Sequence, residues 1–151
     1  MKSFPLAVIA AFSALAACAT PKTTSEPSAD NPTSFAKHIK PIFERRCVRC
    51  HNGYQMPAGL DLTKRDAVLA GKRTVTGQPF IVAGHPESSL IYHAVTQPAE
   101  HPNMMPGDGW GLSTPQEQHV YNWIQSGAAW PNGFRGRLRE KSLRVEFDGD
   151  L

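Results

Sequence analysis

The sequence predicts a small all-α domain, and three observations support this fold class. Apolar residues recur at helical spacing in several segments, and residues typical of helix starts and ends flank these segments. No alternating apolar run is long enough to build a sheet of any size. The chain has 151 residues, enough for one domain. We expect this domain, several helices around one centre, to cover residues 34–131.

The first predicted helix begins near Ser34 and runs toward Cys47. Phe35, Ile39 and Phe43 recur at intervals of four residues and form an apolar stripe, while charged residues lie largely on the other faces. Pro41 lies inside this segment, and a proline in a helix removes one backbone hydrogen bond. We therefore expect a kink or a restart at Pro41.

A brief helix is predicted in the middle of the chain. Thr63 and Asp66 have the spacing of a capping box, and the helix would run through Leu69 and end at Gly71.

Another helix should open at Pro86, because proline is favoured in the first turn of a helix. Leu90, Ile91 and Val95 share one face, and Pro98 marks the break that follows.

The last clear helix has the strongest signals. Thr114 is the expected cap, Pro115 occupies the first helical position and Glu117 follows three residues after the cap. Trp123 lies on the apolar face, and Gly127 is a typical helix end.

The most specific motif of the chain is the segment 47–51, Cys-Val-Arg-Cys-His. On a helical turn, positions i, i+3 and i+4 share one face, so Cys47 and Cys50 can each form a thioether to a haem vinyl group while His51 points its ring at the iron. Two thiols at this spacing followed directly by an imidazole are the attachment pattern of c-type haem. The sequence predicts one covalent haem c bound through Cys47 and Cys50, with His51 as an iron ligand.

Two other interpretations of this motif are a structural zinc site and a redox disulfide. Zinc would require about four ligands, but the chain has three cysteines and the third, Cys18, lies in an apparent targeting segment. A thioredoxin-like disulfide would require a surrounding βαβ pattern, and the segment before Cys47 reads as helix. Both interpretations are therefore less well supported than haem attachment.

The N-terminus resembles the signal peptide of a bacterial lipoprotein. Residues 1–17 have a basic start and an apolar stretch that is too short to span a membrane, and small residues precede Cys18. The sequence Leu-Ala-Ala-Cys resembles a lipobox, in which Cys18 would be acylated and become the first residue of the mature chain. By resemblance to lipoproteins of double-membraned bacteria, Ala rather than Asp at position 19 favours the outer membrane over retention at the inner membrane. We therefore expect a periplasmic protein held by a lipid anchor. The alternative is an ordinary secretory signal in which Cys18 is incidental.

Residues 18–33 are expected to form the lipidated N-terminus and a flexible tether. This segment is rich in Pro, Ser and Thr and has no large apolar side chain, so it cannot bury enough surface to order itself. The whole chain has a formal net charge of only +3. Such a mild charge predicts no nucleic-acid partner.

The sixth iron ligand is expected to come from a loop near residue 105. A methionine there would favour the reduced iron and suit an electron carrier. Met56 is tied too closely to His51 to reach across the haem, which leaves Met104 and Met105. We prefer Met105, because Pro106 restricts it to extended conformations. The other candidates are Met104 and His101, with His85 and His93 behind them.

The chain resembles the planctomycete-type cytochrome c domain. Outside the haem motif, the matching stretches share short Gly-, Pro- or Trp-containing signatures: Ile39-Lys40-Pro41-Ile42-Phe43, Gly59-Leu60-Asp61-Leu62, Gly84-His85-Pro86-Glu87-Ser88-Ser89-Leu90, Met105-Pro106, Leu112-Ser113 and Trp123-Ile124-Gln125-Ser126-Gly127-Ala128-Ala129-Trp130-Pro131. The family usually shows Met-Pro-Pro in the loop, and here Gly107 replaces the second proline. The resemblance implies a small helical domain around a haem ligated by His51 and Met105, with Leu60, Leu62 and Leu90 near the haem.

The function implied by this resemblance is electron transfer between protein partners, such as a periplasmic dehydrogenase or a terminal oxidase, without enzymatic activity. The alternatives are a peroxidase-like haem enzyme with an open sixth site, and a module that anchors a dehydrogenase in the periplasm. Residues 132–151 lie outside the resemblance and form a charged C-terminal tail, read as solvated or as a docking surface for an acidic redox partner. Leu143, Val145 and Phe147 alternate and could form a short edge strand.

Overall fold

The computed structural model describes residues 33–141. The predicted signal peptide, most of the tether including Cys18, and the edge strand around residues 143–147 lie outside this range. The described part is helical, with the elements η1 (Phe35–Ile39), α1 (Lys40–Arg46), η2 (Pro57–Gly59), α2 (Arg65–Leu69), η3 (Pro86–Ser88), α3 (Leu90–Val95), α4 (Thr114–Gln125) and α5 (Gly133–Gly136). Its only strand-like pairing is a single antiparallel bridge between Lys72 and Pro79. The predicted all-α class agrees with this architecture.

The first predicted helix restarts at the proline, as expected. η1 is a π-helix in which the Lys40 N–H donates to the Phe35 carbonyl, and α1 begins at Lys40 with Pro41 in its first turn. The missing N–H of Pro41 costs little there, because the first N–H groups of a helix have no intrahelical partner. Ser34 caps η1 by accepting the Lys37 N–H at 3.2 Å.

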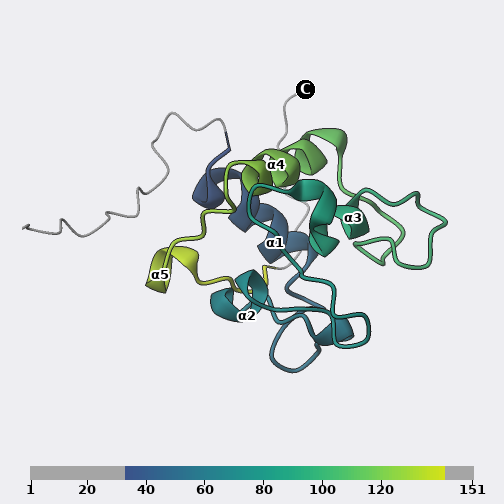
Figure 1. Ribbon diagram of the computed structural model, residues 1–151, viewed down its shortest axis with the longest axis horizontal. Helices are drawn as coiled ribbons and strands as arrows, with labels where there is room; N and C mark the ends of the chain where they lie inside the picture. The colour runs from purple at the N-terminus through teal and green to yellow at the C-terminus, as the bar shows by residue number, and fades with distance from the viewer. Residues whose placement is uncertain (1–32, 142–151) are drawn as a thin grey trace, which may run out of the picture.

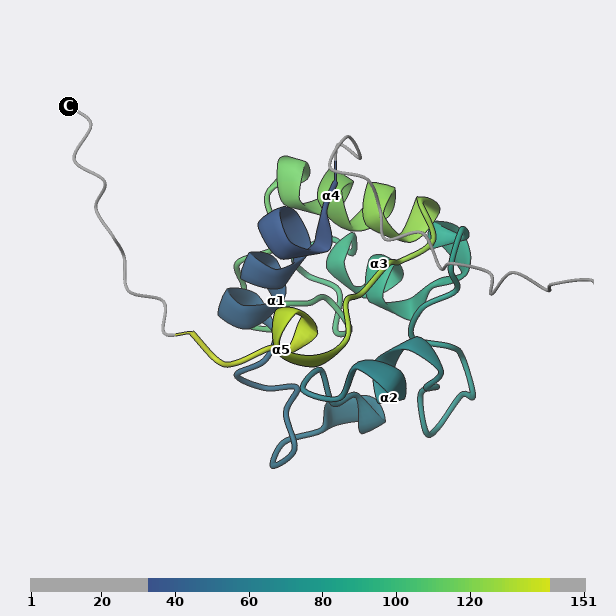
Figure 2. The same cartoon turned by 90° about the vertical axis from the view of Figure 1, so that its left-hand side faces the viewer.

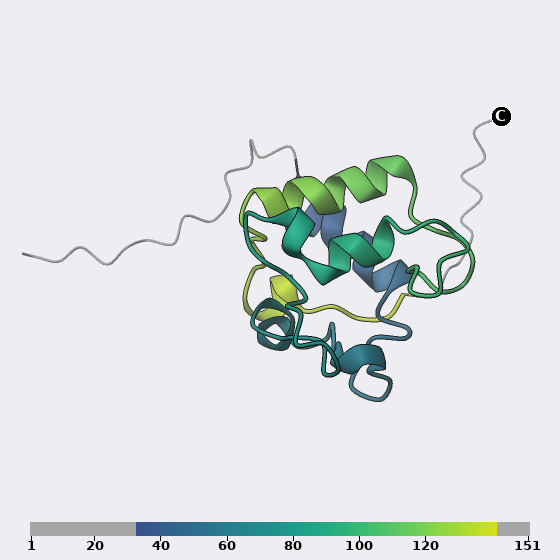
Figure 3. The ribbon, with the colours of Figure 1, turned by 45° about the vertical axis from the view of Figure 1, so that its right-hand side comes forward.

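Helix α4 lies across η1 and α3, and α2 lies on the far side of the molecule (Figures 1 and 2). Figure 3 shows the same order from a third direction, with α4 along one edge and α2 at the other. An aromatic cluster of Phe35, Phe43, Trp123 and Trp130 joins η1, α1 and α4, with Phe35 and Trp130 stacked at 4.7 Å. These rings are almost fully buried and form the centre of the core.

The capping box predicted for the short middle helix is wrong, although the helix itself is present. α2 begins at Arg65, and its N-cap Lys64 makes no side-chain cap. The Thr63 N–H and hydroxyl both donate to Oδ1 of Asp61, at 3.0 and 2.6 Å. Thr63 thus closes a turn with Asp61, two positions earlier in the chain. Asp and Thr side chains often form such local hydrogen bonds instead of capping a helix.

The helix expected to open at Pro86 is divided by Ser89. η3 ends at Ser88, Ser89 has extended backbone angles, and α3 begins at Leu90. Ser89 is fully buried, and its Oγ accepts the Val82 N–H at 2.8 Å and donates to the His85 carbonyl at 2.9 Å. The side chain therefore makes bonds to the backbone that a continuous helix would not provide. α3 ends at Val95, before Pro98 as predicted.

Helix α4 matches its prediction except for the capping residue. The N-cap is Ser113 rather than Thr114, and Ser113 forms a capping box with Gln116, whose Oε1 accepts the Ser113 N–H at 3.0 Å. The helix ends before Gly127, which has a φ of 102°. This positive φ is a conformation that glycine adopts at little cost.

The packed part of the chain continues past Pro131, where the sequence predicted the domain to end. Leu138 is buried, and the backbone N–H groups of Arg139 and Lys141 donate to Glu44 of α1. The buried Glu44 carboxylate also forms an ion pair with Lys141 at 2.8 Å. The polar sequence of this segment concealed these contacts, because they are made largely by backbone groups. No helix among the described residues is long and apolar enough to cross a membrane.

Candidate cofactor site

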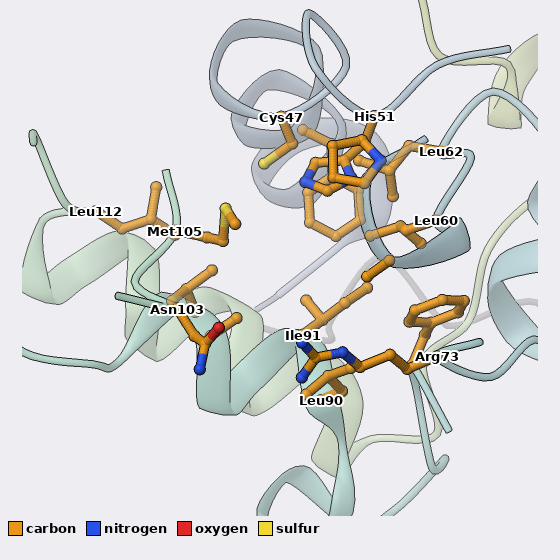
Figure 4. A pocket seen from close by; sticks show the side chains of 16 residues that line it. Cys47, His51, Leu60, Leu62, Arg73, Leu90, Ile91, Asn103, Met105 and Leu112 are labelled. Carbon is orange, nitrogen blue, oxygen red and sulfur yellow. The ribbon is translucent and has the colours of Figure 1, made fainter. Parts of the chain in front are cut away.

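The candidate site is an apolar hollow between the segment that follows α1, helix α3 and the loop after α3 (Figure 4). It holds about 780 Å³ of space, part of which is open to solvent. Sixteen residues line it, most of them apolar: Phe43, Cys47, His51, Pro57, Ala58, Leu60, Leu62, Arg73, Phe80, Leu90, Ile91, Ala94, Val95, Asn103, Met105 and Leu112. The three leucines expected near the haem are among them.

Backbone hydrogen bonds hold the Cys-x-x-Cys-His segment in one tight turn at the end of α1. The N–H groups of Cys50 and His51 both donate to the Cys47 carbonyl, at 3.1 and 2.9 Å. Val48, which lies between Cys47 and Cys50 in the sequence, is buried and anchors the turn in the core. Cys47 and His51 line the hollow, whereas Cys50 is exposed and is not among the lining residues.

Asn52 fixes this turn, and the sequence reasoning did not identify it. Its Nδ2 donates to the carbonyls of Val48 and Arg49 at 2.9 and 3.0 Å, and its Oδ1 accepts the N–H groups of Tyr54 and Gln55. One side chain thus satisfies both ends of the turn. An asparagine directly after a structured turn is the available signal, because Asn side chains often bond nearby backbone.

The imidazole of His51 is buried in the wall of the hollow, with 8% of the residue exposed. Burial lowers the pKa of this ring, while an interaction with the Leu60 backbone acts in the opposite direction. A neutral imidazole retains a nitrogen lone pair, which is what a metal ligand requires. The buried Nδ1 has no hydrogen-bond partner within hydrogen-bonding geometry.

The two thiols of the motif are free, and no disulfide joins them. Burial raises the pKa of the Cys47 thiol to about 12, although the neighbouring Arg46 cation acts in the opposite direction. A thiol with this pKa is protonated at neutral pH and is a poor redox nucleophile. Within residues 33–141, no three His, Cys, Asp or Glu side chains come together as a metal site. The structure therefore gives no support to the zinc interpretation.

The segment 60–62 is hydrogen-bonded to the motif and lies beside it along the hollow. The Leu62 N–H donates to the His51 carbonyl at 3.0 Å, and Leu60 and Leu62 face the hollow. Asp61 points the other way and is buried, with its Oδ2 3.4 Å from Lys64 Nζ. Burial raises the pKa of Asp61, but hydrogen bonds from Thr63 and the charge of Lys64 outweigh it and hold the pKa below its ordinary value. We call residues 47–62 the motif wall.

Met105 lines the hollow from the loop after α3, on the side that also carries Leu112, whereas His51 lies on the side of Leu60 and Leu62 (Figure 4). Its N–H donates to the Ala94 carbonyl at 2.8 Å, which attaches the loop to α3, and the Met105–Pro106 peptide bond is cis. Met104 is buried, with 5% exposed, and does not line the hollow. His101 is exposed and outside the lining, where its Nδ1 accepts the Asn103 N–H. Of the predicted candidates for the sixth ligand, Met105 alone lines the hollow. We call residues 101–112 the methionine loop.

Arg46 connects the methionine loop to α1. Its guanidinium lies 3.4 Å from Oδ1 of Asp108 and donates to the Trp110 carbonyl. Arg46 directly precedes Cys47, so this contact joins the loop to the start of the haem motif. The sequence reasoning did not identify this role, because the partners are more than 60 positions apart in the chain.

The residues present fit a covalently attached haem. A porphyrin is a broad apolar plate, and this hollow offers mostly apolar side chains. It also offers the Cys47 thiol, with the exposed Cys50 thiol three residues further along the chain, a buried imidazole with an unpartnered nitrogen, and a thioether sulfur from the loop. These are the donor types by which proteins hold c-type haem.

Comparison with protein families identifies residues 47–109 as matching the family described as Planctomycete cytochrome C. This range contains the motif wall, helix α3 and Met105. Neither the curated proteins nor the solved structures contain a match to the chain.

Proposed function

We infer that this chain contains a planctomycete-type cytochrome c domain, as the sequence predicted; the match over residues 47–109 supports this, and the family implies a haem protein. From it we propose that the protein is a periplasmic, lipid-anchored monohaem c-type cytochrome that carries single electrons between protein partners. Bound haem would supply the one-electron chemistry of its iron.

The observation that carries the proposal is that one apolar hollow gathers Cys47, His51 and Met105, which are 58 positions apart in the chain at their extremes. His51 and Met105 both line this hollow and reach it from different segments of the chain (Figure 4). With both side chains as iron ligands, no open position would remain for a substrate, which would suit an electron carrier rather than a haem enzyme.

The residues of this chain have distinct tasks in the proposal. Cys47 and Cys50 would hold the haem covalently, and His51 and Met105 would ligate its iron. Leu60, Leu62 and Leu90, which line the hollow, would exclude water and lower the local dielectric, and together with a thioether ligand this would raise the reduction potential. Partners would meet the protein through a small transient interface.

The location in the proposal comes from the sequence. A lipid on Cys18 would anchor the chain and residues 19–33 would act as a tether, with the outer membrane as the expected site. The partners fall into the class of redox proteins, such as a periplasmic dehydrogenase or terminal oxidase, and nucleic acid is not among them.

The test is to express the full chain in a bacterium that attaches haem in its periplasm, and to record its mass and absorption spectra. We expect one covalent haem and a low-spin spectrum in both oxidation states. In the ferric state we expect a weak absorption band at about 700 nm, which indicates methionine ligation. A protein without haem would overturn the proposal. A high-spin ferric spectrum with turnover of peroxide would favour a peroxidase-like enzyme instead.

A further inference from the structure

Arg73 stands apart from the other residues of the hollow because it is the only Lys or Arg among the lining residues. Its Nε is buried and has no hydrogen-bond partner, and none of the ion pairs of residues 33–141 includes it. No Asp or Glu lines the hollow. A guanidinium is always charged in proteins. Arg73 is half-buried, and a buried N–H such as its Nε costs free energy when it has no acceptor. An anion supplied by the occupant of the hollow would offset that cost.

The position of Arg73 agrees with the chemistry of haem. The two vinyl groups of a porphyrin lie on adjacent rings, and the two propionates lie on the rings across from them. In Figure 4, Arg73 lies beside Leu90 and Ile91, on the opposite side of the hollow from Cys47. Thioethers at Cys47 and Cys50 would therefore turn the propionate edge away from the motif and toward the side that carries Arg73.

Backbone contacts fix the place from which Arg73 reaches the hollow. The Arg73 N–H donates to the Gln78 carbonyl at 2.8 Å, and the Gly77 N–H donates back to the Arg73 carbonyl at 2.8 Å. The Thr74 N–H donates to the carbonyl of Ala58, which lines the hollow. The guanidinium is thus presented from an ordered turn.

We propose that Arg73 binds a carboxylate of the haem, holding a propionate as a charge-assisted pair at the edge opposite the thioethers. This inference rests on the haem binding of the proposed function. A planar guanidinium matches a carboxylate in two parallel hydrogen bonds. The pair would neutralise both charges within an apolar hollow and keep the propionate ionised at neutral pH.

The test compares the reduction potentials of the full-length haem protein, Arg73→Gln and Arg73→Lys between pH 5 and pH 8. Arg45→Gln is the matched control, because Arg45 is exposed, does not line the hollow and loses the same charge. We expect a nearly constant potential in the wild type and in Arg45→Gln. In Arg73→Gln the potential should be lower at pH 8 and rise as the pH falls, because the unpaired propionate now takes up a proton. Loss of a neighbouring cation should raise the pKa of that carboxylate by about 1–3 units, and Arg73→Lys should fall between the two.

The outcomes separate this inference from the proposed function. A wild-type protein without covalent haem would overturn both. Covalent haem with Arg73→Gln indistinguishable from Arg45→Gln would overturn the role of Arg73 alone. If Arg73→Gln does not accumulate, infrared spectra of wild-type protein with ¹³C-labelled haem carboxylates decide. Bands of an ionised carboxylate that stay constant from pH 5 to pH 8 support the pair, and titration of both propionates like solvated carboxylic acids contradicts it.

Discussion

The motif wall is held by its own backbone and by Asn52 and Asp61, whereas the methionine loop has hydrogen bonds of its own and is also tied to other elements. In the wall, the bonds from Cys50, His51 and Leu62 join residues that are close in sequence, and Val48 and Leu62 are buried. The loop depends on Arg46 from α1 and on the Ala94 carbonyl from α3. This difference teaches that the covalent side of the site is locally determined, while the sixth-ligand side requires the assembled domain.

The largest expected effect comes from removing the thiols of the motif wall. Cys47→Ser combined with Cys50→Ser should abolish covalent haem attachment, because no other thiol lies among the described residues. Mass spectrometry of the purified protein measures this directly. Cys18→Ser is the matched control and should keep the haem mass while losing the mass of the lipid. Covalent haem in the double variant would contradict the assigned attachment.

The sequence could predict the motif wall well, because its chemistry is written in consecutive residues. Positions i, i+3 and i+4 meet on any helical turn, so the grouping of Cys47, Cys50 and His51 needs no long-range contact. Met105 was a preference among several candidates, and its placement in the hollow depends on how α3 packs. Arg46, Arg73 and the contacts of Glu44 with Arg139 and Lys141 could not be predicted, because each joins parts of the chain with no shared sequence signal.

The next effect separates the two methionines of the loop. Met105→Ala should keep the covalent haem but lose the ferric absorption band at about 700 nm. It should also lower the reduction potential, by about 59 mV for each tenfold loss of preference for ferrous iron. Met104→Ala should leave the absorption band and the reduction potential unchanged. It should lower the free energy of unfolding by about 2–5 kcal/mol, because Met104 is buried. Spectra, potentiometry and denaturant unfolding of both variants check this. The reverse pattern would assign the ligand to Met104.

A smaller effect tests how the motif wall is supported by Asp61. Its folded-state pKa is lowered by Thr63 and Lys64 against the opposing effect of burial, so the stabilisation is complete above the unfolded-state pKa and is lost as the pH falls through the folded-state pKa. Asp61→Asn should lower the free energy of unfolding by about 1–3 kcal/mol at pH 7.

Denaturant unfolding at several pH values measures the difference between wild type and Asp61→Asn. This difference should shrink below about pH 4, where the wild-type carboxylate begins to take up its proton. Asp66→Asn is the control, since the Asp66 side chain is 87% exposed and pairs only with Arg65, and it should change the stability little at any pH. A constant difference for Asp61→Asn down to pH 3 would exclude the charge of Asp61 as the cause.

The smallest effect concerns the bond between the methionine loop and α1. Arg46→Gln removes the contacts to Asp108 and the Trp110 carbonyl, and a partly exposed pair of this kind contributes about 0.2–1 kcal/mol. The loop should then open more often, so imidazole should displace the methionine from ferric haem up to about fivefold faster. Stopped-flow mixing with imidazole measures this rate, and Arg45→Gln controls for the lost charge. Equal rates in the two variants would mean that the loop is held by Ala94 and its own packing rather than by Arg46. The methionine loop would then differ from the motif wall only in the sequence separation of the residues that its hydrogen bonds join.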